Sequence, residues 1–135
     1  MKKAPRILVV DDDDSLRTAL EKTLRKAGYA VTLARSAEEA DEAVAAGRYD
    51  LVLTDYRMPG KTGLALARDL AAKYGEKAPP VIVMTAHGEM TNYLEAMELG
   101  TVEEYINKPV GRDDLLVILE GVLHGHGRKR RVRKL

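Results

Sequence analysis

The sequence predicts an α/β fold in which helices cover both faces of a parallel sheet. Five short apolar segments, typical of strands, alternate along the chain with segments whose apolar residues recur at helical spacing. Three of the strand segments are continuously apolar, at residues 7–10, 51–53 and 81–84. Because interior strands of a parallel sheet are covered on both faces, we expect these three strands in its interior.

The remaining segments complete a regular order of strand and helix. Residues 30–33 and 102–107 are mixed in polarity and are expected to form the two edge strands. Helices are expected at residues 16–27, 37–46, 64–74, 89–99 and 113–123. Five such units predict a (βα)5 doubly wound sheet with the flavodoxin-like strand order 2-1-3-4-5.

Local signals mark the boundaries of the first two helices. Gly28 follows the first helical segment, where a glycine commonly ends a helix. Ser36 and Glu39 have the spacing of a capping box at the start of the second helix. Asp13 and Asp14 are interpreted in the same way, as polar residues that begin the first helix.

Composition narrows the class of protein. The chain has 135 residues, of which 45% are hydrophobic and 32% charged, and this suits one globular domain. Cysteine is absent, which excludes disulfides and thiolate chemistry. No apolar run is long enough to cross a membrane, and the first residues do not resemble a signal peptide. We therefore expect a cytoplasmic protein that does not act at a membrane.

Charge is distributed unevenly along the chain. The net charge is +1, but residues 128–135 hold six basic residues and no acidic one, so the preceding residues carry −5. Gly125 and Gly127 favour flexibility before this basic segment. We expect a folded domain at residues 1–124 and a basic, flexible tail at residues 125–135. The tail either binds nucleic acid or an anionic lipid, or is simply solvated or part of a linker.

Reactive side chains lie at the carboxyl ends of four of the predicted strands. They are Asp11 and Asp12, Asp55, Thr85, and Lys108. The carboxyl ends of parallel strands meet at one edge of a sheet, so we expect these side chains to lie together. Clustered carboxylates repel one another unless a cation neutralises them, and an all-oxygen ligand set favours Mg²⁺. A hydroxyl and an ammonium beside that cation would suit a phosphoryl group. Each residue alone is readily explained as a cap or loop residue, and only the set indicates a site.

Four motifs resemble the receiver domains of two-component response regulators, over about residues 5–124. The motifs are Val9-Val10-Asp11-Asp12, Leu53-Thr54-Asp55-Tyr56-Arg57-Met58-Pro59-Gly60, Met84-Thr85-Ala86-His87 and Tyr105-Ile106-Asn107-Lys108-Pro109. The loop after Asp55 is most similar to receivers that precede ATPase-type transcription activators. A single-domain receiver of the chemotaxis type is an equally open interpretation.

The resemblance implies a role for each matching residue. Asp55 would accept the phosphoryl group. Mg²⁺ would be bound by Asp11, Asp12, Asp55 and the backbone carbonyl of Arg57. Lys108 would pair first with the Asp55 carboxylate and then with the phosphoryl oxygens, which completes the catalytic set together with Thr85.

The resemblance also implies a conformational switch. Thr85 would move to hydrogen-bond the phosphoryl group, and the ring of Tyr105 would then turn into the vacated space. Arg57 and His87 would flank the path of the water that slowly removes the phosphoryl group. The chain would thus be a phosphoacceptor switch with at most slow autophosphatase activity, and not an enzyme in the ordinary sense.

Three local features accompany the resemblance. The peptide bond between Lys108 and Pro109 is expected to be cis. Val110 replaces the phenylalanine that usually follows, so we expect looser packing there. Thr62, after Lys61, replaces a common aspartate, and this change is expected to affect partner contacts more than phosphate chemistry.

The resemblance implies one partner that donates the phosphoryl group and another that binds the chain afterwards. A sensor histidine kinase or phosphotransfer protein would donate the phosphoryl group. A downstream effector or a second copy of the chain would bind the surface of the fourth helix, fifth strand and fifth helix. Three alternatives remain open: a Mg²⁺-dependent aspartyl-phosphate hydrolase, an interaction module with an inactive site, and a nucleic-acid-binding regulator acting through residues 128–135. Such hydrolases usually carry their nucleophile on the first strand and add a cap domain, for which this chain has no room.

Overall fold

The structure is a computed structural model that describes residues 3–86 and 102–125. The helix expected at residues 89–99, the loop residue His87 and the basic tail at residues 128–135 lie outside these ranges. Within them, no helix is sufficiently long and apolar to pass through a membrane.

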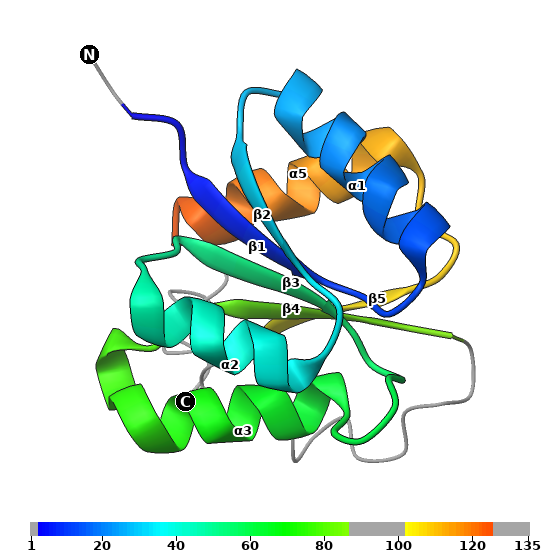
Figure 1. Cartoon of the computed structure of the whole chain (residues 1–135). Helices are drawn as coiled ribbons and strands as arrows, with labels where there is room; N and C mark the ends of the chain where they lie inside the picture. The colour runs from blue at the N-terminus through cyan, green and yellow to red at the C-terminus, as the bar shows by residue number, and fades with distance from the viewer. Residues whose placement is uncertain (1–2, 87–101, 126–135) are drawn as a thin grey trace, which may run out of the picture.

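A five-stranded sheet forms the centre of the molecule (Figure 1). Its strands are β1 (Arg6–Val10), β2 (Ala30–Ala34), β3 (Leu51–Asp55), β4 (Val81–Thr85) and β5 (Val102–Asn107). They lie in the order β2-β1-β3-β4-β5, and all neighbouring pairs are parallel. This confirms the expected strand order, with β2 and β5 at the edges.

Helices cover both faces of the sheet (Figure 1). One layer holds α1 (Asp14–Lys26) and α5 (Arg112–Leu123), and the opposite layer holds α2 (Ala37–Ala46) and α3 (Gly63–Tyr74). A short 3-10 turn, η1 (Gly75–Lys77), follows α3. The two layers correspond to two separate clusters of buried apolar side chains, one on each face of the sheet.

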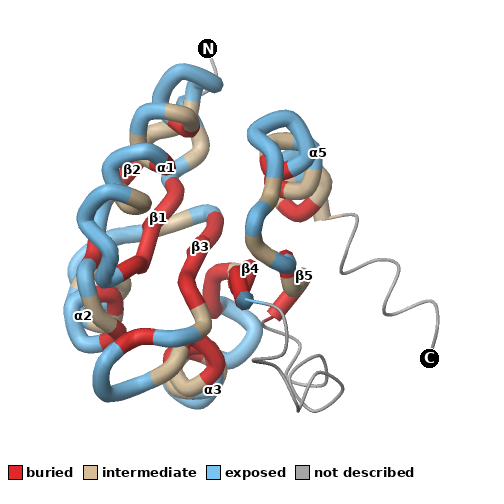
Figure 2. Tube along the Cα trace, turned by 90° about the vertical axis from the view of Figure 1, so that its right-hand side faces the viewer, coloured by how far each residue is buried: buried red, intermediate tan, exposed pale blue. Residues whose placement is uncertain are grey.

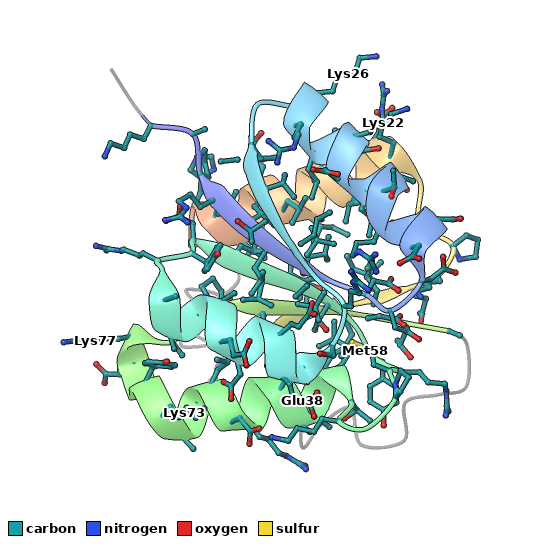
Figure 3. The ribbon with its side chains drawn as sticks, in the orientation of Figure 1. Lys22, Lys26, Glu38, Met58, Lys73 and Lys77 are labelled. Atoms are coloured by element: carbon teal, nitrogen blue, oxygen red, sulfur yellow. The ribbon has the colours of Figure 1, made fainter. Side chains whose placement is uncertain are left out.

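The interior strands are buried on both faces, as their apolar sequence predicts. In β1, Ile7 and Val9 belong to the cluster under α1 and α5, whereas Leu8 and Val10 belong to the cluster under α2 and α3. Figure 2 shows β1, β3 and β4 as buried segments between exposed helical surfaces. Lys22 and Lys26 of α1 point outward from the molecule (Figure 3).

The expected helix boundaries are largely confirmed. Gly28, after α1, has a φ of 103°, a backbone conformation that favours glycine. At α2 the Ser36 hydroxyl accepts a hydrogen bond from the Glu39 N–H at 3.1 Å. The Glu39 carboxylate accepts from the N–H of Arg35 at 2.8 Å, one residue before the partner expected in a capping box.

The parallel order brings all the strand ends that carry reactive side chains to one edge of the sheet. The segments that follow β1, β3, β4 and β5 start there, and the candidate site lies at this edge.

Candidate functional site

Three carboxylates meet where β1 and β3 end. Asp11 and Asp12 directly follow β1, and Asp55 is the last residue of β3. Each offers a carboxylate oxygen, and these oxygens all lie within 4.8 Å of one another. Asp11 and Asp55 are buried, with 1% and 7% exposure, whereas Asp12 is exposed. An oxygen-only cluster of this kind can hold a hard cation.

Asp11 is fixed by three hydrogen bonds. Its N–H donates to the carbonyl of Ala34 at 3.1 Å, and its own carbonyl accepts from Nη1 of Arg17 at 2.7 Å. The side-chain oxygen Oδ1 accepts from the N–H of Asp13 at 2.9 Å. The other oxygen, Oδ2, is buried and has no hydrogen-bond partner among the described residues. A buried carboxylate oxygen without a donor fits a site for a cation.

The electrostatics of Asp11 also favour a cation. Burial raises the pKa of its carboxyl above the ordinary value of 3.8, and the negative charges of Asp55 and Asp12 raise this pKa further. The Asp13 N–H and the Lys108 ammonium act in the opposite direction, but the net shift is upward. Ionised Asp11 is therefore electrostatically unfavourable in the folded chain, and a bound cation would stabilise it.

Lys108 contributes the positive charge of the site. Its ammonium lies 2.5 Å from Oδ1 of Asp55, and the two side chains are 28% and 10% exposed. The backbone N–H of Lys108 donates to the carbonyl of Thr85 at 2.9 Å, which joins the ends of β4 and β5. The Lys108–Pro109 peptide bond is cis, as expected.

Thr85 and Tyr105 project from the same face of the sheet. Thr85 pairs with Asn107 in the β4–β5 register, and Tyr105 pairs with Val83 two residues earlier. Thr85 is 2% exposed, and its hydroxyl donates to the carbonyl of Ala86 at 3.1 Å. Tyr105 is half-buried against the cluster under α2 and α3. The two residues therefore occupy neighbouring positions of adjacent strands on one face of the sheet.

The loop after β3 carries the remaining expected site residue that the structure describes. Arg57, two residues after Asp55, is exposed, and the next residue, Met58, is buried at 6% exposure (Figure 3). A Cβ at Gly60 would lie 3.8 Å from Oε2 of Glu38, so the loop runs beside the start of α2.

The two positions that depart from the family pattern, Thr62 and Val110, lie in different parts of the site. Thr62 caps α3, because its hydroxyl accepts a hydrogen bond from the Ala65 N–H at 3.0 Å. Lys61 pairs with Asp69 of α3 at 2.6 Å. Val110 is partly buried against the cluster under α1 and α5.

Two residues at the site, Gly63 and Arg17, were not predicted from the sequence. Gly63 begins α3 so close to β3 that a Cβ there would overlap the carbonyl oxygen of Asp55 and lie 3.0 Å from Cγ2 of Thr54. Arg17 binds the carbonyl of Asp11. Both act on main-chain atoms, whose positions follow from tertiary packing.

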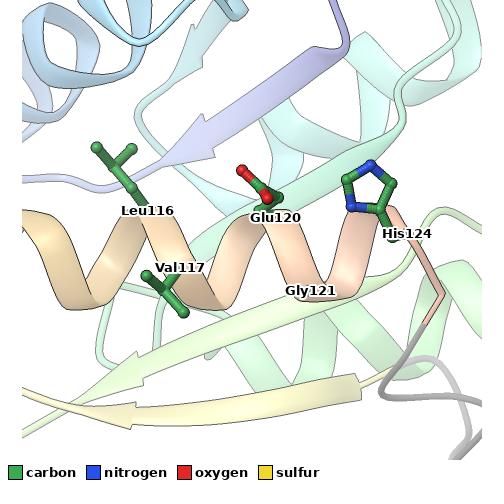
Figure 4. A pocket seen from close by; sticks show the side chains of 5 residues that line it. All are labelled: Leu116, Val117, Glu120, Gly121 and His124. Atoms are coloured by element: carbon green, nitrogen blue, oxygen red, sulfur yellow. The ribbon is translucent and has the colours of Figure 1, made fainter.

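A hollow lies on α5 (Figure 4), and neither Asp11, Asp12 nor Asp55 lines it. The residues that line it are Leu116, Val117, Glu120, Gly121 and His124. Val117 is 71% exposed, which is unusual for a large aliphatic side chain on a helix of this kind. This surface belongs to one of the elements expected to contact partners.

Comparison with known proteins identifies relatives along almost the whole chain. The family described as the response regulator receiver domain matches residues 7–120. The transcriptional regulatory protein ZraR of Escherichia coli (strain K12) is 41% identical over 121 residues, which cover 89% of this chain and 27% of ZraR. The transcriptional regulatory protein ResD of Bacillus subtilis (strain 168) is 38% identical over 121 residues, covering 87% of this chain and 48% of ResD. The chain thus spans half of these relatives or less.

Solved structures show the same architecture. The signal receiver domain of an HD domain-containing protein from Pseudomonas fluorescens Pf-5 superposes with a TM-score of 0.83 and 26% identity, covering 98% of this chain and 96% of that one. A response regulator receiver domain protein from Methanospirillum hungatei JF-1 superposes with a TM-score of 0.82 and 25% identity, covering 95% and 98%. With its motifs, its strand order and these relatives, the chain belongs to the response regulator receiver domain family of two-component systems.

Proposed function

We propose that the chain is a phosphoacceptor switch in which Asp55 takes a phosphoryl group from a phosphohistidine in a Mg²⁺-dependent reaction. The donor would be a sensor histidine kinase or a phosphotransfer protein, and the chain itself would act in the cytoplasm. The observation that carries this proposal is the position of Asp55 between the carboxylates of Asp11 and Asp12 and the Lys108 ammonium at 2.5 Å. A nucleophilic carboxylate beside both a candidate cation site and a fixed ammonium suits phosphoryl transfer.

In the proposed reaction, a carboxylate oxygen of Asp55 attacks the phosphorus atom. An O–P bond forms while the N–P bond of the phosphohistidine breaks, and the bonding electron pair returns to the imidazole nitrogen. Mg²⁺, held by Asp11, Asp12, Asp55 and the Arg57 carbonyl, would neutralise negative charge on the phosphoryl oxygens. The Lys108 ammonium would pair with the Asp55 carboxylate before transfer and with the phosphoryl oxygens afterwards. The three acidic side chains also exclude an anion until their charge is offset, so transfer depends on the cation.

Hydrolysis of the aspartyl phosphate would be slow, so the modified chain would last long enough to act as a signal. Arg57 and His87 are proposed to adjust the access of the hydrolysing water. Arg57 is exposed next to the site, which supports such a role. The chain would therefore have autophosphatase activity at most, in keeping with a family of switches.

Phosphorylation of Asp55 would change the positions of the Thr85 and Tyr105 side chains. The Thr85 hydroxyl donates to its neighbouring carbonyl, and in the phosphorylated state it would turn to the phosphoryl group. Tyr105, on the same face of the sheet, would follow into the vacated space. The surface that changes would comprise β5, α5 and the helix expected at residues 89–99. The exposed Val117 and the hollow on α5 support a downstream effector or a second copy binding there (Figure 4).

The proposed functional unit is the domain at residues 1–124, and the basic tail at residues 125–135 would be separate from it. The six basic residues of this tail offer a second candidate contact, with nucleic acid. Because the relatives ZraR and ResD are longer than this chain, their full activities as transcriptional regulators are not transferred to it.

Acetyl phosphate provides a direct test of the phosphoacceptor. Incubated with Mg²⁺, the wild-type chain is expected to gain one phosphoryl group by mass spectrometry, and EDTA is expected to prevent the gain. Asp55→Asn should stay unmodified. Asp69→Asn, which removes a partly exposed carboxylate on α3 that pairs with Lys61, is the matched control and should be modified like the wild type. Modification of Asp55→Asn at the wild-type rate would refute the assignment, and multiple turnover of a phosphomonoester would favour the hydrolase instead.

A further inference from the structure

Arg17 of α1 joins two parts of the turn that carries Asp11 and Asp12. Its Nη1 donates to the main-chain carbonyl of Asp11 at 2.7 Å, and its Nη2 binds Oδ1 of Asp14. The Arg17 side chain is only 11% exposed, whereas that of Asp14 is 82% exposed. The hydrogen bond from Arg17 lowers the pKa of the Asp14 carboxyl, and the charge of Arg17 lowers it further. The Arg17 side chain is therefore largely buried, and its guanidinium forms an ion pair with the exposed carboxylate of Asp14.

The contacts of Arg17 converge on the segment that positions the carboxylates. The main-chain N–H of Arg17 also donates to the carbonyl of Asp13 at 2.9 Å, but this is the first backbone bond of α1 and does not depend on the arginine side chain. Asp13 in turn donates its N–H to Oδ1 of Asp11, which leaves Oδ2 of Asp11 buried and without a partner among the described residues. A change at Arg17 would therefore reach the Asp11 carboxylate through main-chain atoms, without contact with a cation.

We propose that Arg17 is a positioning residue that fixes the turn at residues 11–14 and thereby strengthens Mg²⁺ binding by Asp11 and Asp12. The inference rests on the proposed function, because it assumes that these carboxylates hold Mg²⁺. Ligands that are held in place before a metal arrives bind it more tightly, and loss of an outer-shell partner typically weakens metal binding about 10- to 100-fold.

The charge of Arg17 has the opposite effect on a cation. A positive guanidinium near the cluster repels Mg²⁺, so its removal would strengthen binding if charge were its only influence. Asp14 offsets this charge, since the two side chains form an ion pair. We therefore expect positioning to outweigh repulsion. The direction of the change in affinity separates the two effects.

Arg25 provides a matched control on the same helix. Its Nη2 donates to the main-chain carbonyl of Val31 at 2.9 Å, and its Nε pairs with Glu21 at 3.0 Å. It thus makes the same two kinds of bond as Arg17, but its carbonyl partner lies in β2 and not beside the carboxylates. A general contribution of such bonds to the stability of α1 would appear in both residues, although the Arg25 side chain is 54% exposed and that of Arg17 only 11%.

The test compares Arg17→Ala with Arg25→Ala by NMR titration with Mg²⁺. Arg17→Ala is expected to raise the Mg²⁺ dissociation constant about 10-fold, whereas Arg25→Ala should leave it unchanged. A metal-free measurement accompanies this. Hydrogen exchange of the Asp13 amide, which bonds to Asp11, should become faster in Arg17→Ala and stay at the wild-type rate in Arg25→Ala.

Arg17→Lys keeps the positive charge, and it replaces Arg17→Ala in the Mg²⁺ titration if Arg17→Ala does not fold. A lysine ammonium can reach one acceptor but cannot bridge two as the guanidinium does, so its Mg²⁺ affinity should lie between those of the wild type and Arg17→Ala. An affinity equal to or higher than that of the wild type, in whichever variant folds, overturns the inference. If the wild type binds no Mg²⁺ and takes no phosphoryl group from acetyl phosphate, the proposed function fails and takes this inference with it. If the wild type does both while Arg17→Ala matches it, only the inference fails.

Discussion

Gly63 lies directly against the main-chain oxygen of Asp55, so that a Cβ at position 63 would overlap it. The N–H of Gly63 also donates to the carbonyl of Tyr56 at 2.8 Å. The start of α3 is thereby packed onto the end of β3, where the proposed phosphoacceptor lies. Glycine is required here for close backbone approach and not for an unusual φ, because Gly63 is not among the described glycines with positive φ.

Gly63→Ala is expected to destabilise the domain and to slow phosphorylation of Asp55. The added methyl group must displace either α3 or the end of β3, and overpacking of this kind typically costs about 1–3 kcal/mol. Thermal unfolding measures the first effect, and the rate of modification by acetyl phosphate measures the second. Gly47→Ala is the control, since the nearest contact of a Cβ there would be an ordinary 3.5 Å. A Gly63→Ala variant with wild-type melting and wild-type kinetics would show that the backbone approach is not needed.

Lys108→Ala should fold but should accept phosphate poorly. Lys108 follows the edge strand β5 and belongs to neither cluster of buried apolar side chains, so its removal opens no cavity in either cluster. It removes the ammonium beside Asp55, and loss of one such stabilising group commonly costs on the order of 10²-fold in rate. Circular dichroism checks the fold, and mass spectrometry of the acetyl phosphate reaction follows the rate. A wild-type rate combined with a wild-type response to the phosphoryl mimic beryllofluoride would exclude the proposed role.

The sheet and the acidic cluster could be predicted from the sequence because both follow from strong local signals. Continuous apolar runs mark β1, β3 and β4 as interior strands, and the parallel order then brings Asp11, Asp12 and Asp55 to one edge. The pairing of Lys108 with Asp55 was implied by the family resemblance, and the structure has this ion pair. These features depend on which residues end the strands, and the sequence shows this directly.

Arg17 and Gly63 could not be predicted in this way. Both contact main-chain oxygens, of Asp11 and of Asp55, and every residue carries such an oxygen whatever its side chain. Their importance depends on how closely α1 and α3 approach the strand ends, which is decided by packing across the whole layer. The partner of Glu39 was misplaced by one residue for a similar reason, because the path of the chain before α2 decides which N–H its carboxylate meets.

Asp11→Asn is expected to make the metal-free domain more stable at neutral pH. Burial and the neighbouring carboxylates raise the pKa of Asp11 in the folded chain, so its ionised form opposes folding. A buried polar group without compensation typically costs at least about 1 kcal/mol, which corresponds to a few degrees, roughly 2–6 °C, in melting temperature. Thermal unfolding in EDTA provides the measurement.

The pH dependence of this difference has a defined direction. Above the folded-state pKa of Asp11, the wild type carries the full penalty of the ionised carboxyl. As the pH falls through that pKa toward the ordinary value of 3.8, Asp11 binds a proton in the folded state first, so the gap to Asp11→Asn should narrow. Added Mg²⁺ should stabilise the wild type more than the variant. A variant that is less stable than the metal-free wild type at pH 7 would contradict the electrostatic account of the site.

Thr85 and Tyr105 are expected to respond together to a phosphoryl mimic. In the unmodified chain the Thr85 hydroxyl donates to the Ala86 carbonyl at 3.1 Å, and the Tyr105 ring lies on the same face of the sheet. Beryllofluoride with Mg²⁺ should draw the hydroxyl away and shift the NMR signals of labelled Tyr105. Thr85→Ser, which keeps the hydroxyl, should preserve most of this shift, whereas Thr85→Ala should lose most of it. Tyr49, whose ring lies 4.8 Å from the guanidinium carbon of Arg6, is the internal control and should not change. An unchanged Tyr105 signal in the wild type, or an equal shift in Thr85→Ala, would mean that the hydroxyl does not couple the site to this ring.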